Sequence, residues 1–118
     1  MFHYSCPAHF SQVAAVTAVR DDEDLVTETV ARYHQARDLV IDRLDAMPKV
    51  RVHRPGGAFY AFFAVEGMDY SLERCKDILR QTHVGLAPGA AFGERGEGFI
   101  RLCFASALAR LDDAMNRI

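Results

Sequence analysis

The sequence has no tryptophan, only two lysines and only three cysteines among its 118 residues. It also lacks the ~18–20 consecutive apolar residues that a membrane-spanning helix needs, so we expect no membrane partner. Three cysteines at irregular spacing do not form a disulfide framework. The first residues carry neither the basic nor the apolar region of a secretory signal. Together these absences predict a cytoplasmic protein with reduced thiols.

Charge of one sign is not in excess, since 14 Lys and Arg face 16 Asp and Glu for a net charge of −2. This balance gives no reason to expect a nucleic-acid partner. Half of the residues are hydrophobic and a quarter are charged, which is typical of a soluble globular domain. The length suits a single domain. Among the basic residues arginine dominates, because Lys49 and Lys76 are the two lysines.

Apolar periodicity predicts two helices in the first part of the chain. Residues 8–19 are rich in Ala and Val with few charges. The acidic run 21–24 then suits the start of a long helix, where it caps free N–H groups, although such a run could instead bind a metal. Pro48 ends this helix. Its apolar residues recur at spacings of three and four: Val26, Val30, Tyr33, Ala36, Val40, Leu44 and Met47.

After Pro48 the pattern changes to the alternation and short apolar runs that are typical of strands. Ser71 is expected to cap a further helix, and a last helix begins near Ala107. Cys75 and Cys103 lie in apolar segments and are expected to be small buried residues. The expected strands cover residues 50–52, 58–65, 84–87 and 99–104. This order predicts an α+β fold in which helices cover a small mixed sheet, preceded by the long helix.

Arg101 is the first candidate for chemistry, because it lies in an otherwise apolar strand. Burying a cation costs several kcal/mol unless it is paired. An internal carboxylate is the commoner partner, and spacing alone favours it. The alternative is a ligand carboxylate or phosphate, which the planar guanidinium can grip with two hydrogen bonds.

Other chemical patterns are weak. The Gly-rich loop 87–98 matches no phosphate-binding motif, so we interpret it as a turn. His3, Cys6 and His9 have a spacing that metals can use, but a fourth ligand is missing and we predict no metal site. A lysine that forms a Schiff base must be desolvated, and neither lysine of this chain fits that requirement. We therefore predict no catalytic, cofactor-binding or metal-binding residue in the chain.

Three segments, 5–15, Pro-Gly-Gly-Ala-Phe-Tyr at 55–60, and 85–101 with its pattern PG…FG…G…R, follow one another in a specific order. Together they resemble the C-terminal, small-domain part of the class I/II aminotransferases, pyridoxal-phosphate enzymes of the aspartate aminotransferase type. The first is similar to the stretch that opens a helix after the family's cofactor lysine, the second to its Gly-Gly-x-Phe strand and the third to its closing signature. The resemblance covers essentially the whole chain.

The resemblance implies transfer of an amino group between an amino acid and a 2-oxo acid. It makes Arg101 the residue that binds the substrate α-carboxylate, which reverses the preference for an internal ion pair. It makes Phe59 a lining residue of the active site and Gly57 the position that lets the chain pass close beside it. The family's cofactor lysine lies upstream of this segment, so the chain alone is expected to be inactive and to lack pyridoxal 5′-phosphate.

The same resemblance implies a division of the chain. Residues 1–20 would be a helical segment belonging to a large domain outside the chain, and residues 21–118 the small domain, truncated at both ends. The parent enzyme would be a homodimer. Its substrate stays open among aspartate, aromatic, alanine and succinyl-diaminopimelate types.

Two other hypotheses remain. The chain could be a self-contained α+β ligand-binding or regulatory module without catalysis, in which Arg101 holds an effector carboxylate. It could also be a structural fragment without a ligand, in which Arg101 pairs internally. A large exposed apolar patch would favour a fragment over a module.

Overall fold

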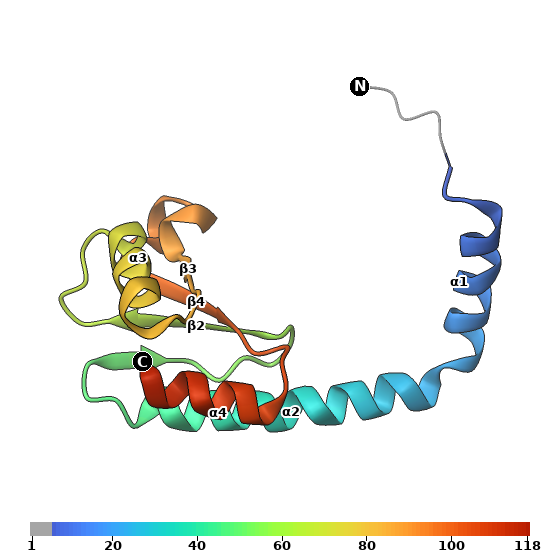
Figure 1. Cartoon of the computed structure of the whole chain (residues 1–118), viewed down its shortest axis with the longest axis horizontal. Coiled ribbons are helices and arrows are strands. Elements are labelled where there is room, and N and C mark those ends of the chain that lie inside the picture. Colours follow the sequence, from blue (N-terminus) through green and yellow to red (C-terminus); the bar gives the residue numbers. More distant parts are fainter. Residues whose placement is uncertain (1–5) are drawn as a thin grey trace. The chain divides into compact units, whose positions relative to one another are not determined.

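The computed structural model describes residues 6–118 (Figure 1). The backbone contacts divide the chain into two compact units, one ending at Ala31 and the other spanning Arg32–Ile118. The boundary falls inside a long helix. Within residues 6–118, no helix is both long enough and apolar enough to cross a membrane.

The first unit contains helix α1 (His9–Asp21) and the first turns of α2 (Glu23–Asp45). The two helices expected from the sequence are confirmed. Glu23 and Asp24 lie in the first turn of α2, where the helix dipole favours negative charge. None of the residues of α1 is buried, and its exposed side chains include Phe10 and Val19.

The second unit is an α+β layer, as the sequence predicts. A four-stranded sheet has the order β1-β2-β4-β3. Its elements are β1 (Val50–Val52), β2 (Tyr60–Val65), α3 (Ser71–Thr82), β3 (Ala87–Pro88), β4 (Phe99–Cys103) and α4 (Leu108–Arg117), with short 3-10 turns η1 (Gly89–Phe92) and η2 (Glu94–Gly96) between β3 and β4. The expectation of a mixed sheet is wrong in one respect, because every pairing is antiparallel. Strands β2 and β3 run in the same direction, but β4 lies between them.

The strand register separates the sheet into two chemically different faces. Ala61 and Phe63 of β2 lie opposite Leu102 and Ile100 of β4, and all four are buried. We call this the inner face. It shares one core with the helices, whose contributions are Ala36, Val40, Ile41 and Leu44 of α2, Cys75 of α3, and Leu111 and Met115 of α4. The other side, the outer face, carries Phe62 and Arg101 as another opposed pair.

Helix α4 lies alongside the C-terminal half of α2 (Figure 1). Arg43 of α2 donates hydrogen bonds to Asn116, at 2.8 Å, and to Asp112 of α4. Leu44, the next residue of α2, is fully buried. Polar contacts of Arg43 therefore lie beside the apolar packing of this helix.

The start of α3 corrects one prediction. Ser71 is the first residue of the helix and not its cap, and its side chain is fully buried. Its backbone N–H donates to Oε1 of Glu97 at 2.6 Å, and its hydroxyl oxygen accepts from the backbone N–H of Ala90 at 3.3 Å. A carboxylate distant in the sequence therefore caps the helix, and the same contacts hold the loop between β3 and β4.

Two strand boundaries and the burial of one cysteine differ from the prediction. Ala58 has a left-handed φ of 59°, so β2 begins only at Tyr60. The strand expected at 84–87 covers only Ala87–Pro88. Cys75 is buried as expected, whereas Cys103 is exposed because it lies on the outer face, opposite Tyr60.

Candidate functional site

Arg101 lies on the outer face of the sheet, between β2 and β3. It is paired with Phe62 on one side and with Ala87 on the other. Alternation along β4 places Ile100 and Leu102 in the core and turns Arg101 away from it. The strand therefore presents a half-buried cation on the outer face, away from the buried side chains of the core.

Two aromatic rings flank the Arg101 guanidinium. Its carbon Cζ lies 4.2 Å from the ring centroid of Tyr60 and 3.9 Å from that of Phe92, both within cation–π range. Among residues 6–118, no carboxylate lies within ion-pair distance of Arg101, although other basic residues form seven such pairs. The internal ion pair that spacing alone favoured is not formed by the described residues.

An exposed aromatic cluster continues from Arg101 across the outer face. Phe62 stacks on Phe99 with centroids 4.9 Å apart and an interplanar angle of 1°. Phe62 also meets Phe92 edge-on, at 6.4 Å and 85°. A hollow of about 340 Å³ adjoins the cluster and is lined by Arg51, Val52, His53, Phe62, Ala64 and Phe99. The outer face thus combines a cation, aromatic surface and a concave area.

The other two predicted binding residues lie differently with respect to Arg101. Phe59 is partly buried against the core, 4.6 Å from the ring of Tyr60 and 5.8 Å from that of Tyr33. Its ring contacts the ring of Tyr60, which in turn contacts the Arg101 guanidinium. Gly57 is exposed, and a Cβ added there would meet no heavy atom within 4 Å. No described part of this chain makes the close approach expected at Gly57.

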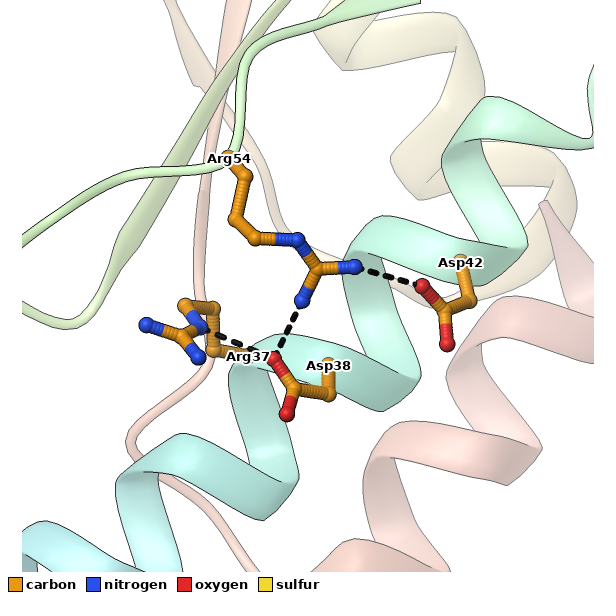
Figure 2. A network of polar contacts seen from close by, with 4 residues as sticks. All are labelled: Arg37, Asp38, Asp42 and Arg54. Carbon is orange, nitrogen blue, oxygen red and sulfur yellow. Dashed lines mark hydrogen bonds and ion pairs between the residues drawn. The ribbon is translucent and has the colours of Figure 1, made fainter.

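The turn between β1 and β2 is attached to α2 by a network of ion pairs (Figure 2). Arg54 donates to Asp38 and, at 2.8 Å, to Asp42, and Arg37 also donates to Asp38 at 2.9 Å. The hydrogen bond from Arg37 and the positive charges of Arg37 and Arg54 lower the pKa of Asp38. The network holds the residue that precedes the 55–58 turn, which in turn leads to Phe59.

The loop between β3 and β4, which carries Phe92, is closed by a close approach of the backbones of Gly89 and Gly96. A Cβ at Gly89 would overlap the carbonyl oxygen of Gly96 and come within 2.6 Å of the carbonyl oxygen of Phe99. Only glycine permits this approach of two backbones. Glu97 accepts hydrogen bonds from the backbone N–H of Ser71 and Gly98, which lower the pKa of its carboxyl. The loop is therefore fixed at both glycines and at Glu97.

Sequence reasoning missed Tyr60 and Phe92 as partners of Arg101. For Tyr60 a signal existed, because alternation from Phe62 places it on the same face of β2. For Phe92 none existed, since its ring reaches Arg101 only through the path of the 3-10 turns.

Both lysines of the chain have exposed side chains. Lys76 donates to Glu73 at 2.8 Å and has a half-exposed side chain, and Lys49 is exposed. His3 lies outside the described residues, and among residues 6–118 no group of three His, Cys, Asp or Glu side chains gathers to hold a metal.

Comparison with known proteins finds the same family throughout. Residues 2–118 match the family described as aminotransferase class I and II. The chain is 39% identical to an aspartate aminotransferase of Pyrococcus horikoshii over 94% of its length. It is 36% identical to aromatic-amino-acid aminotransferase 2 of Thermococcus litoralis over its whole length.

Solved structures agree with these relatives. An aromatic aminotransferase from Pyrococcus horikoshii superposes with a TM-score of 0.88 at 36% identity, over 95% of this chain. An alanine aminotransferase from Pyrococcus furiosus gives 0.89 at 32% identity, also over 95%. A structure described as a PLP-bound putative aminotransferase from Clostridium difficile gives 0.82 at 25% identity.

The chain spans less than a third of these relatives, since it covers 29% of the P. horikoshii and 31% of the T. litoralis sequence. The matched part nevertheless includes every described helix and strand of this chain. With sequence and fold in agreement, the chain belongs to the class I and II aminotransferase family.

Proposed function

We propose that this chain is the C-terminal part of a pyridoxal-phosphate-dependent aminotransferase and that Arg101 binds the α-carboxylate of its amino-acid or 2-oxo-acid substrate. One observation carries the proposal above all others. Arg101 is half-buried on the outer face, flanked by two rings, and among residues 6–118 it has no carboxylate partner.

This arrangement suits carboxylate binding. Rings that contact the face of a guanidinium leave its N–H groups free in the plane, where two of them can donate to the two oxygens of one carboxylate. Such a bidentate contact fixes the orientation of the substrate as well as its position. Phe59 supports the ring of Tyr60, which makes it an indirect part of the same binding surface.

The cofactor would be held by residues beyond this chain. Pyridoxal phosphate supplies an electron sink for chemistry at the substrate Cα. Because Lys49 and Lys76 do not fit as its anchor, the chain alone is expected to carry no lysine-bound cofactor and to be inactive.

The remaining parts of the proposal concern the parent enzyme. Residues 1–20 would belong to its large domain and residues 21–118 to its small domain. The parent would act as a cytoplasmic homodimer. The exposed Phe10 and Val19 of α1 are compatible with a helix that packs against a segment outside this chain.

Substitution of Arg101 in the full-length protein tests the proposal. Arg101→Ala should raise the KM for both the amino acid and the 2-oxo acid roughly 10- to 150-fold, the value of hydrogen bonds to a charged group. Arg101→Lys should recover part of this loss, since it keeps the charge without the fork. Arg80→Ala is the control, because Arg80 lies on the exposed side of α3 and pairs with Asp77. An unchanged KM in Arg101→Ala would overturn the assignment.

The isolated chain tests the role of the lysines. After it is mixed with pyridoxal phosphate and dialysed to remove the free cofactor, the chain should retain no visible absorbance. It should also catalyse no transamination. A retained visible band that disappears in Lys49→Arg or Lys76→Arg would contradict the proposal.

A further inference from the structure

Phe92 lies in the 3-10 turn η1, not in a strand, and its ring contacts the guanidinium of Arg101. Its ring centroid lies 3.9 Å from Cζ of Arg101, closer than that of Tyr60 at 4.2 Å. We propose that Phe92 is a positioning residue, which fixes the guanidinium of Arg101 in the orientation that receives the substrate carboxylate. This inference rests on the proposed role of Arg101 and adds a determinant of its affinity.

Arg101 needs such a partner because nothing polar within residues 6–118 orients it. An arginine side chain has many rotamers, and ordering it on binding costs conformational entropy. Elsewhere in the chain carboxylates order the guanidinium groups, as Asp38 and Asp42 do for Arg54. At Arg101 the aromatic contacts take over this function before any ligand arrives.

Phe92 is itself held in place from two directions. Phe62 meets its ring edge-on at 6.4 Å, and Phe62 is in turn stacked on Phe99 at 4.9 Å. The backbone that carries it is closed by the contact between Gly89 and Gly96. A ring fixed in this way can restrict Arg101, whereas a freely rotating ring could not.

The position of Phe92 argues against a merely structural role. Its side chain is 48% exposed and does not belong to the buried core or to the partly buried residues around it. Packing of the core therefore does not require an aromatic residue here. The contacts that use its ring are those with Arg101 and Phe62.

The kinetic test compares Phe92→Leu with Phe92→Tyr in the full-length protein. Phe92→Leu should raise the KM for the 2-oxo-acid substrate about three- to tenfold, the range of a partly desolvated cation–π contact, and leave kcat within about twofold. Phe92→Tyr should restore the wild-type KM. Leu79→Ala, at a side chain with 49% exposure on α3, serves as the control and should change neither constant.

A second readout needs no activity. In the 118-residue chain, the rings should shift the side-chain NMR signals of Arg101 upfield, and Phe92→Leu should remove about half of this shift while Phe92→Tyr retains it. Loss of the shift together with the KM effect supports the proposal. A Phe92→Leu protein with lower kcat and melting temperature but unchanged KM and NMR shift would overturn it.

The two proposals fail in different ways. If Arg101→Ala leaves the KM unchanged, the assignment of Arg101 fails. If Arg101→Ala raises the KM but Phe92→Leu does not, Arg101 keeps its role and the positioning by Phe92 is refuted.

Discussion

A methyl group added at Gly89 should displace the loop that presents Phe92 to Arg101. The new Cβ would overlap the carbonyl oxygen of Gly96 and lie 2.6 Å from that of Phe99, and both obstacles are backbone atoms. No side-chain rotation can relieve such a clash. The backbone of the loop must therefore move, or β4 must shift with it.

The cost follows from the overpacking of well-packed regions, about 1–3 kcal/mol. For a chain of 118 residues this corresponds to a fall in melting temperature of about 4–12 °C. Gly85→Ala is the matched control, since a Cβ there would meet no heavy atom within 4 Å. It should change the stability little, or raise it slightly by restricting the unfolded chain.

Thermal unfolding of the wild-type, Gly89→Ala and Gly85→Ala proteins, followed by circular dichroism, measures the difference in their melting temperatures. The upfield shift of the Arg101 signals should decrease in Gly89→Ala and persist in Gly85→Ala. If Gly89→Ala unfolds within 1 °C of Gly85→Ala, the contact between the glycines does not constrain the loop and the reasoning is refuted.

Three further predictions concern the body of the domain. Leu44→Ala, at a fully buried position, should cost about 2–5 kcal/mol in urea unfolding, and a loss under 1 kcal/mol would contradict the packing of α2. Arg54→Ala should cost about 1 kcal/mol at low salt and less at 1 M NaCl, since its pairs with α2 are partly exposed, while Arg51→Ala should cost nothing measurable. The lowered pKa of Glu97, which follows from its backbone hydrogen bonds, means that its stabilisation is present above the ordinary carboxyl value of 4.5 and is lost as the pH falls through the lowered pKa. Glu97→Gln should thus reduce the fall in melting temperature as the pH drops below 4.5, and an unaltered pH profile would speak against the cap.

Much of the fold follows from local pattern. The spacing of Val40 and Leu44 predicts the buried stripe of α2, and both side chains are fully buried. Alternation in β4 predicts that Arg101 points away from Ile100 and Leu102, as it does. These features depend on the period of a helix or a strand, which a sequence displays directly.

The remaining features depend on contacts between distant residues. Ser71 has the chemistry of a cap, but Glu97 performs that function from a loop 26 residues away. Cys103 lies in an apolar run, yet it is exposed because strand alternation places it on the outer face, opposite Tyr60. The approach of Phe92 to Arg101 requires the path of the whole loop, which no periodicity encodes.

The pairing of β2 with β4 also has a consequence for the fidelity of folding. A slip of one residue would exchange the faces of β4, placing Arg101 in the core and Ile100 outside. Burial of an unpaired guanidinium would penalise that alternative by several kcal/mol. The residue proposed to bind substrate thus also disfavours mispaired strands. A neutral replacement at Arg101 would remove this energetic penalty on the shifted register together with the binding group.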